Sequence, residues 1–508
     1  MAHPPPSPIP HRNARILSVI AATLIALACG TNYGFSAWAP QFATTLSLSA
    51  TQINLIGNAG NLGMYAVGIP SGILIDTHGP RWGVLLGTVC LGSGYWLLKR
   101  AYDAAGEGYG MVGLCAMGFL TGVGSCSAFS ASIKVCATNW PRHRGTATAF
   151  PLSGFGLSAF LFTAVSRVAF PDDTSGLLLL LGTGTFVMTG TGMVFLRMFP
   201  QSAVLEEGER ESHKRSDSNE MRRSRSGESA RHLIHDDDPT TETSSLVSTP
   251  TDSLSSKPSP HHHAHHPNIT GLALLHSPSF YLLFITLGLL SGVGLMTINN
   301  IGNTAKALWH HTDPSTPSSF IQQRQLMHVA IISVFSFLGR LGSGIGSDYL
   351  VHHDASRFWT LVASAGIFTS AQVVGLTLSN PNHLFLLSAL TGLAYGALFG
   401  VFPALVADAF GPTGMGINWG AMTMAPVITG NIYNLAYGRI LDSHSVIHEG
   451  GDGKDREQIC DLGRECYASA YWLTLASSIV GVAWSLWCIR REKVLRTRRA
   501  VEGREREA

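Results

Sequence analysis

Carboxamide side chains recur along one apolar stretch near the start of the chain, residues 53–65 (INLIGNAGNLGMY). Facing lipid, each carboxamide would lose its hydrogen-bond partners at a cost of several kcal/mol. The stretch must therefore turn its polar face toward protein or water, either to hydrogen-bond a neighbouring helix or to line a pathway for a polar solute. Four residues at offsets of 0, 4, 7 and 11 share this helix face: Asn54, Asn58, Asn61 and Tyr65.

One charged residue, Arg340, falls inside another apolar stretch. Charged residues within membrane spans are functional candidates by default, because an unpaired charge is costly in lipid. Arg340 lies about 12 Å along a helix from Asp348, at the usual rise per residue. It could bind the carboxylate of a solute, or it could form a buried gating ion pair with an acid such as Asp408. The ion pair is the favoured interpretation of the two.

The elements that must hold these side chains are membrane helices. Only 13% of the 508 residues are charged, 45% are hydrophobic and 55 are glycine, and a membrane helix needs about 20 mostly apolar residues. The sequence therefore predicts an all-α polytopic membrane protein with twelve transmembrane helices in two six-helix bundles. The expected spans are 15–38, 53–74, 82–98, 109–133, 146–168 and 176–198, then 277–300, 325–347, 357–378, 383–406, 418–440 and 468–489.

A polar segment separates the two sets of spans. Residues 201–270 lack the apolar content to form a core and are expected to be a disordered cytosolic linker. Their tract HHHAHH at 261–266 is interpreted as a solvated polar run, with metal binding as the alternative. The predicted organisation is a cytosolic tail at 1–14, bundles at 15–200 and 271–490, and a basic cytosolic tail at 491–508.

Lysine and arginine in the short loops favour a cytosolic position for both termini. The tail IRREKVLRTRR is expected to lie against anionic headgroups. The net charge is +2 and the basic residues are scattered or next to the membrane, so nothing indicates nucleic-acid binding. Cys460 and Cys466 share a non-cytosolic loop and are candidates for a disulfide if that face is oxidising.

A short motif occurs once in each half, at the expected cytosolic end of the second helix of that half. GILIDTHGPR (72–81) and GIGSDYL (344–350) share a glycine followed four residues later by an aspartate. The glycines would allow close helix approach, the aspartates would accept N–H groups at a helix start, and the arginine could pair with an acid. Such contacts would latch the cytosolic side in one state and break in another; a simple helix-end cap is the alternative. The gating residues are Gly72, Asp76, Gly79, Arg81, Gly344 and Asp348.

The Gly-x3-Asp-x2-Gly-x-Arg pattern resembles the major facilitator superfamily, with Thr77 in place of the second basic residue. NLGMYAVGIPSGILIDTHGP (61–80), GALFGVFPALVADAFG (396–411) and NWGAMTMAPVITGNIYN (418–434) are similar to the fungal monocarboxylate-transporter homologues and nodulin-like facilitators. The resemblance covers the membrane part and implies that helices 1, 4, 7 and 10 line a cavity, while helices 2, 5, 8 and 11 close the seam between halves. On that arrangement the expected substrate pathway comprises Asn32, Tyr33, Asn58, Asn61, Tyr65, Asn299, Asn300, Asn303, Arg340, Asn431 and Asn434.

These features predict a secondary transporter that moves a small organic solute by alternating access, with a monocarboxylate as the first candidate. Facilitated diffusion and symport with H+ are both open, because no second acid stands out within the spans. No catalytic residue, cofactor or metal site is expected, since P-loop, HExxH and CxxC patterns are absent. The expected protein is a monomer in the lipid bilayer of the vacuole or plasma membrane. The alternatives are a non-transporting membrane sensor and a metal-ion transporter, the latter suggested by the histidine tract.

Overall fold

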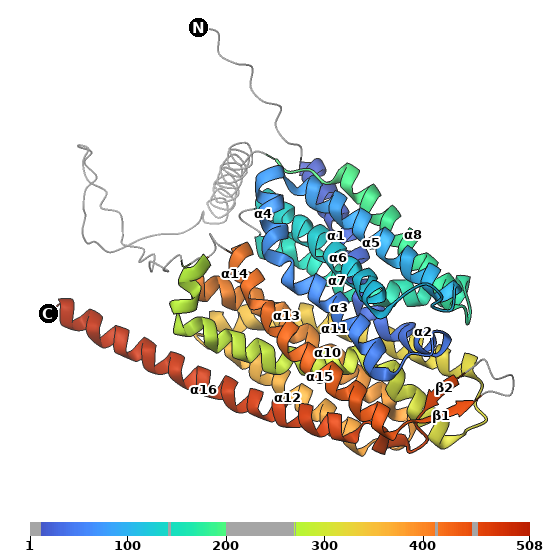
Figure 1. Cartoon of the computed structure of the whole chain (residues 1–508). Coiled ribbons are helices and arrows are strands. Elements are labelled where there is room, and N and C mark those ends of the chain that lie inside the picture. Colours follow the sequence, from blue (N-terminus) through green and yellow to red (C-terminus); the bar gives the residue numbers. More distant parts are fainter. Residues whose placement is uncertain are drawn as a thin grey trace, which may run out of the picture. The chain divides into compact units, whose positions relative to one another are not determined.

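The computed structural model describes residues 12–140, 144–199, 269, 271–411, 415–449 and 456–507 (Figure 1). The segments Arg12–Met198 and Pro267–Ala508 cluster into one compact unit. Residues 1–11, 200–268 and 270 lie outside the described part, and with them the histidine tract and nearly all of the expected linker. The predicted limits of the domains therefore stay predictions.

The N-terminal half consists of helices. Its first helix, α1, runs on through a 3-10 segment, η1, and every other connection is short. The elements are α1 (Arg12–Cys29), η1 (Gly30–Ala37), α2 (Ala39–Thr45), α3 (Ala50–Ala66), α4 (Gly68–His78), α5 (Pro80–Asp103), α6 (Met111–Asn139), α7 (Arg144–Ala169) and α8 (Thr174–Phe195).

The C-terminal half repeats this pattern and adds an antiparallel hairpin before its last helix. Strand β1 pairs with β2, Val446 opposite Ile459. The elements are η3 (Gly271–His276), α10 (Pro278–Thr312), α11 (Ser318–His352), α12 (Phe358–Thr377), η4 (Pro381–His383), α13 (Leu384–Phe410), α14 (Met415–Met422), α15 (Met424–His444), β1 (Val446–Glu449), β2 (Arg456–Ile459), η5 (Gly463–Cys466) and α16 (Ala468–Glu507).

The predicted all-α polytopic fold is confirmed. Among the described residues, nine helices are long and apolar enough to cross a bilayer, by length and composition alone. The other three predicted spans correspond to α5 and to two interrupted pairs, α3 with α4 and α14 with α15. Counted in this way, the described residues form six spans in each half.

Two spans predicted as continuous are broken, and a proline follows each break. A proline cannot donate its backbone nitrogen and its ring clashes with the carbonyl four residues earlier. Pro70 lies four residues after Ala66, where α3 ends, and Pro426 lies four residues after Met422, where α14 ends. The second helix of the N-terminal half and the fifth of the C-terminal half thus break at the same distance before a proline, whereas α7 and α13 continue through Pro151 and Pro403.

Glycines let α11 and α13 pack with their backbones in contact. A Cβ atom built at Gly339 would lie 2.3 Å from Leu393 O, and one at Gly396 would lie 2.1 Å from Ser336 O. The N-terminal half repeats this arrangement between α3 and α6, where a Cβ at Gly122 would lie 2.0 Å from Gly60 O. Helix approach of this kind is a common means of association in membranes.

The sequence predicted that the glycines of the repeated motif allow close approach of helices, and that prediction is wrong. A Cβ atom at Gly72 or Gly344 would meet nothing within 4 Å, because both positions face away from the neighbouring helices. Gly79 is required for a different reason. Its φ of +94° ends α4 in a conformation that L residues with a side chain rarely adopt.

Candidate functional site

Four buried asparagines form a hydrogen-bonded chain across the two halves. Asn54 Nδ2 donates to Asn300 Oδ1 at 2.8 Å, Asn300 Nδ2 donates to Asn434 Oδ1 at 3.2 Å, and Asn434 Nδ2 donates to Asn58 Oδ1 at 2.9 Å. Asn303 adds a bond to Asn300 Oδ1 at 3.3 Å. Two members lie on α3, one on α10 and one on α15, so this carboxamide chain joins the N-terminal half to the C-terminal half.

The carboxamide chain occupies the face that the sequence pattern predicts, while the opposite face of α3 carries exposed Leu55 and Leu62. Three asparagines on α3 and α10 have a side-chain amide nitrogen that is buried with no hydrogen-bond partner among the described residues: Asn58, which belongs to the chain, and Asn61 and Asn299, which do not. An unpaired buried donor costs about 1–3 kcal/mol. These nitrogens are donors that a polar solute could use.

Two residues of the expected pathway lie apart from the carboxamide chain. Asn32 bonds within the N-terminal half, where its Oδ1 accepts from Tyr95 at 3.4 Å and Thr121 at 3.2 Å. Asn431 is half-buried and donates to Val427 O of its own helix at 2.7 Å. Asn32 and Asn431 lie on helices that were expected to line the pathway or the seam. The packing of those helices turns both side chains away from the carboxamide chain.

Three tyrosines meet at the centre of the unit. The hydroxyl of Tyr65 lies 2.9 Å from that of Tyr395 and 3.3 Å from that of Tyr33, which in turn donates to Tyr395 at 3.4 Å. Tyr33 and Tyr65 belong to the predicted pathway. Tyr395, on α13 between Gly392 and Gly396, was not part of that prediction. Its only signal in the sequence is a hydroxyl in an apolar span that also contains Ser388 and Thr391.

Arg340 lies beside this tyrosine cluster, which we define as Tyr33, Tyr65 and Tyr395. Its guanidinium carbon is 6.0 Å from the ring centre of Tyr33 and 5.4 Å from that of Phe155. Nη1 donates to Leu152 O at 3.1 Å. The side chain is 6% exposed, and its Nε has no hydrogen-bond partner among the described residues.

The expected ion pair between Arg340 and Asp408 is wrong. Asp408 lies near the end of α13 and accepts from Arg357 Nε at 2.9 Å. Arg357 also donates to Asp348 at 2.8 Å, so both acids are held at the helix ends, away from Arg340. No carboxylate among the described residues forms a salt bridge with Arg340.

The repeated motif binds within each half instead of joining the halves. In the N-terminal half Asp76 pairs with Lys134 of α6. In the C-terminal half Asp348 and Asp408 share Arg357. The aspartates of the motif therefore bind cationic side chains. The sequence had predicted backbone N–H groups at a helix start as their partners. In this state the described motif residues do not latch one half onto the other.

We call the end of the spans where the motifs lie the inner end. There the two broken helices, α3 with α4 and α14 with α15, contact each other across the two halves. The hydroxyl of Thr423 lies 3.0 Å from Tyr65 O and 2.8 Å from Gly420 O. A Cβ atom at Gly68 would lie 3.5 Å from Gly420 Cα. The carbonyl next to one helix break thus accepts a hydrogen bond from the residue at the other break.

We expect Thr423→Val to favour opening of the inner end. Valine keeps the shape of threonine but cannot donate to Tyr65 O. The Thr423 hydroxyl shares its one proton between two carbonyl oxygens, so we expect the lost bond to cost about 0.5–1.5 kcal/mol, as for an ordinary hydrogen bond. Reaction of an Ile69→Cys reporter with a water-soluble thiol reagent should accelerate about two- to tenfold. Thr429→Val is the matched control, since Thr429 bonds only within α15. Equal rates in the two variants would show that the bond does not hold this end closed.

At the outer end, opposite the motifs, an acid of the C-terminal half is one of the contacts between halves, beside the bond from Gln41 Nε2 to Gln325 Oε1 at 2.6 Å. Asp442 of α15 accepts from the backbone nitrogens of Ala50 at 2.7 Å and Thr51 at 2.9 Å, at the start of α3. Gly438 makes the approach possible, because a Cβ there would lie 2.8 Å from Thr51 Cα. A carboxylate at a helix N-terminus is stabilised by the helix dipole. In Figure 1, α3 and α15 lie side by side.

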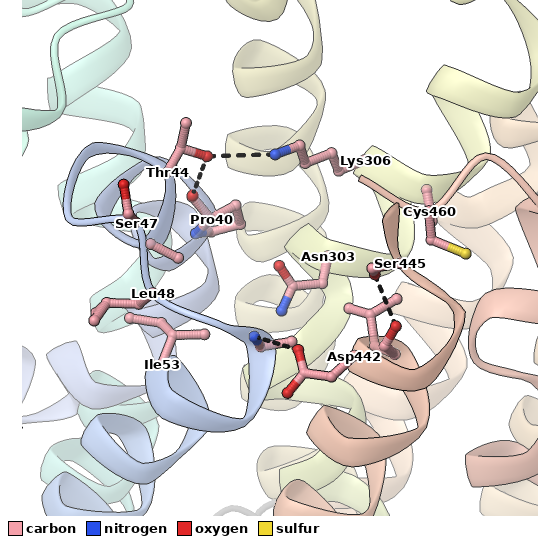
Figure 2. Close-up of a pocket in the computed structure, with 14 residues that line it drawn as sticks. Pro40, Thr44, Ser47, Leu48, Ile53, Asn303, Lys306, Asp442, Ser445 and Cys460 are labelled. Carbon is pink, nitrogen blue, oxygen red and sulfur yellow. Dashed lines mark hydrogen bonds between the residues drawn. The ribbon is translucent and has the colours of Figure 1, made fainter. Parts of the chain in front are cut away.

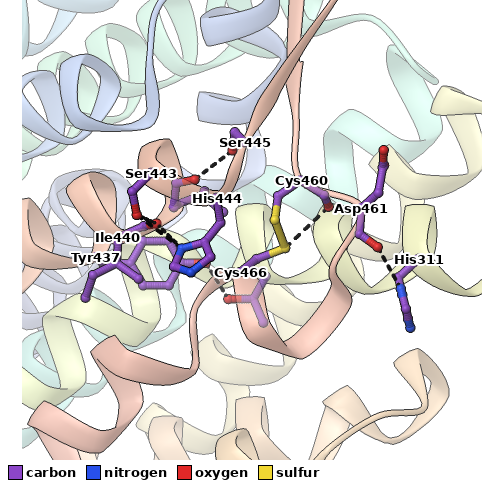
Figure 3. The surroundings of a disulfide bond; sticks show 11 residues. His311, Tyr437, Ile440, Ser443, His444, Ser445, Cys460, Asp461 and Cys466 are labelled. Atoms are coloured by element: carbon purple, nitrogen blue, oxygen red, sulfur yellow. Dashed lines mark hydrogen bonds between the residues drawn. A yellow bond between two sulfur atoms is a disulfide. The ribbon is translucent and has the colours of Figure 1, made fainter.

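A disulfide joins Cys460 to Cys466 in the segment that follows the hairpin (Figure 3). The backbone carbonyl of Asp461, next to the disulfide, accepts from Nδ1 of His311 at 2.7 Å and so ties this segment to the end of α10. Figure 3 shows His311 reaching the segment from its neighbouring helix. Elsewhere in the described part, no group of three or more His, Cys, Asp or Glu residues could hold a metal ion.

We expect a cysteine at position 58 to react with a water-soluble thiol reagent whenever the outer end opens. The carboxamide chain would then be exposed to water, and a bound solute should slow the reaction. Leu62→Cys is the control on the same helix, because its side chain faces outward and would meet lipid. The native free cysteines must first be replaced. Complete protection of position 58 with and without solute would leave the carboxamide chain as packing alone.

Comparison with known proteins places this architecture among transporters. A family model described as Major Facilitator Superfamily matches residues 21–433. The uncharacterized membrane protein YMR155W of Saccharomyces cerevisiae is 27% identical, over 90% of this chain and 91% of its own. A protein named probable transporter MCH1 from Gibberella zeae is 26% identical, over 93% of this chain and 89% of its own.

Solved structures agree on the fold. A bacterial homologue of the human lysosomal transporter Spinster superposes with a TM-score of 0.60 at 12% identity, covering 94% of this chain and 98% of its own. The nucleoside transporter NupG gives a TM-score of 0.57 at 12% identity, covering 93% and 99%. The resemblance expected from the sequence, including its fungal transporter branch, is confirmed.

Proposed function

This chain belongs to the Major Facilitator Superfamily, and from that premise we propose that it is a secondary transporter for a small organic solute bearing one carboxylate. The chain is an integral, multi-pass membrane protein of a transporter family. The proposal adds the substrate class and the mechanism of alternating access. Its solute-binding centre comprises Arg340 and the tyrosine cluster.

The observation that carries the proposal is the isolation of Arg340. A buried cation is costly unless an anion or several acceptors compensate its charge. Arg340 is 6% exposed and has one hydrogen bond, to Leu152 O, and its Nε has no partner among the described residues. A guanidinium with free donors binds carboxylate oxygens in a bidentate geometry. A solute carboxylate would therefore supply the missing acceptor, with the tyrosine hydroxyls beside it.

Alternating access is supported by the two closures. Asp442 holds α3 at the outer end, and Thr423 holds the break between α3 and α4 at the inner end. Asp442 accepts two hydrogen bonds from the other half and Thr423 donates one, so either contact could break while the two glycine-packed bundles stay intact. A solute that bound one open form better would shift the population toward that form.

The test is uptake by purified protein in sealed vesicles. We expect saturable uptake of labelled lactate, and we expect lactamide, its neutral analogue, to compete at least about tenfold less well because it cannot neutralise Arg340. Repeating uptake with an inward proton gradient separates symport, which accelerates, from facilitated diffusion, which does not. Absence of carrier-dependent flux for lactate and for other small carboxylates would contradict the proposal and favour a membrane sensor.

The position in the cell is also proposed. A disulfide in the outer segment suits a compartment that is oxidising, as the cell exterior is. We propose that the outer end faces the exterior or the vacuolar lumen, and that both tails and the 201–270 linker face the cytosol. Protease cleavage within 201–270 from outside right-side-out vesicles would overturn this topology.

A further inference from the structure

Two hollows in the described part of the chain differ in what they face. The first, of about 260 Å³, lies at the outer end between the two halves, where Asn303 and Asp442 line it (Figure 2). It belongs to the seam described above. The second, of about 520 Å³, lies on the outside of the N-terminal half, between α5 and α8, which pack side by side (Figure 1). We call it the α5–α8 groove, and its lining residues are Arg81, Trp82, Leu85, Met193 and Val194.

The α5–α8 groove is cationic at its inner end and apolar along the rest. Arg81 is the second residue of α5, and Leu85 lies one turn further along, about 6 Å at the usual rise per residue. The last turn of α8 contributes Met193 and Val194. Trp82, Leu85 and Val194 are exposed, and in a chain that spans a membrane this surface meets lipid. The groove therefore combines one cationic group with a wall that suits a hydrocarbon chain.

Arg81 lacks the anionic partners that its counterpart in the C-terminal half has. Arg357 directly precedes α12, the third span of that half, and pairs with two acids. In the N-terminal half the corresponding acid, Asp76, pairs with Lys134 of α6 instead. The sequence predicted that Arg81 pairs with an acid, but none of the described residues forms a salt bridge with it. Its guanidinium is therefore available to an anion from outside the chain.

The surroundings of Arg81 select among the anions that could reach it. A soluble phosphate or carboxylate has no apolar part, so it gains nothing from the wall of the groove. A phospholipid carries a phosphate and an acyl chain, and the phosphate suits the forked N–H donors of a guanidinium. Trp82, next to Arg81, is of the residue type that is enriched at the level of the headgroups. The position and chemistry of the groove thus match a lipid of the inner leaflet.

We propose that the α5–α8 groove binds one anionic phospholipid, whose phosphate accepts hydrogen bonds from Arg81 and whose acyl chain lies along Leu85 and the end of α8. Lipids with a choline headgroup fit less well, because their own cation already neutralises the phosphate. Attraction of an anionic lipid to an arginine near the membrane surface adds to the contact with the acyl chain. The site goes beyond the proposed transport, since none of its lining residues belongs to the solute-binding centre.

Trp82 lines the groove, so its fluorescence reports which lipid occupies it. Full-length protein in phosphatidylcholine bilayers is titrated with a lipid whose acyl chains carry bromine, which quenches fluorescence on contact. The two brominated lipids are phosphatidylglycerol, which is anionic, and phosphatidylcholine. The chain has ten tryptophans, so each protein is measured beside its own Trp82→Phe version. The difference between the two gives the emission of Trp82.

We expect brominated phosphatidylglycerol to half-quench Trp82 at a mole fraction about fivefold lower than brominated phosphatidylcholine, the effect of one arginine near a membrane surface. Arg81→Gln should abolish this preference. Arg81 is exposed and forms no described salt bridge, so the variant should fold. Arg100→Gln is the matched control and should keep the preference. Arg100 is an exposed arginine near the opposite end of α5, where it stacks on Trp96.

Equal quenching by the two lipids would overturn the proposal, because the groove would then be an ordinary lipid contact without a headgroup site. A preference that persists in Arg81→Gln would also overturn it. Two competitors identify the source of the anion. Displacement of brominated phosphatidylglycerol by millimolar glycerol 3-phosphate would reveal a site for soluble phosphates, and displacement by an equal mole fraction of oleate would reveal a fatty-acid site. Either result would overturn the proposal. These measurements need no transported solute, so a failure of the proposed function leaves their outcome unchanged.

Discussion

Replacing Arg340 by glutamine is expected to reduce carboxylate uptake about 30-fold or more, while leaving the protein folded. Losing one partner of a desolvated, hydrogen-bonded charge pair costs about 2–5 kcal/mol, and each 1.4 kcal/mol is about tenfold in affinity. Stability should stay constant or rise, because a buried cation without an anionic partner is itself unfavourable. Arg340→Lys keeps the charge but loses the forked geometry, so it should retain part of the activity.

The measurement is initial uptake rate in vesicles containing equal amounts of folded variant, with thermal unfolding of each purified protein alongside. Arg324→Gln is the matched control. Arg324 lies on the same helix, but its guanidinium stacks on Trp309 and Phe320 near the outer end, 5.9 and 4.8 Å from their ring centres. Normal uptake by Arg340→Gln would show that the buried guanidinium has a structural role, and the proposed substrate class would lose its main support.

Replacing Gly339 by valine is expected to prevent correct folding of the C-terminal half. The first added carbon would lie 2.3 Å from Leu393 O and 2.8 Å from Ala397 N. Both atoms belong to the backbone of α13, so no side chain can move aside and the two helices must separate. Overpacking typically costs about 1–3 kcal/mol when side chains can adjust. Here the cost should lie at or above the top of that range.

The test compares Gly339→Val with Gly342→Val, which lies three residues further along α11, where an added Cβ meets nothing within 4 Å. Both variants carry the same loss of helix-breaking glycine and the same gain of a branched side chain. We expect monodisperse protein and a normal melting temperature only for Gly342→Val. If both variants purify and melt alike, the backbone contact between α11 and α13 does not limit stability.

The sequence by itself determined the class of protein and the positions of its spans. Apolar runs of sufficient length, interrupted by one long polar segment, allow only a polytopic membrane protein, because an unpaired backbone cannot cross lipid. The helical spacing of Asn54, Asn58 and Asn61 likewise required that face to point toward protein or water. The two breaks were not predicted. Pro70 and Pro426 each lie four residues after a break, but α7 and α13 continue through Pro151 and Pro403, so a proline alone does not mark a break.

The tertiary structure decided which residues meet. Helical periodicity gives the face on which Arg340 or Asp442 lies, but not the helix that packs against it, because that depends on rotations set by contacts distant in sequence. Asp408 therefore pairs with Arg357 and not with Arg340, Tyr395 joins two tyrosines of the other half, and Asp442 reaches the start of α3. Each of these contacts joins separate helices, and most of them join the two halves. Such contacts are fixed by backbone packing at glycines such as Gly438, where the absence of one carbon atom allows the helices to approach.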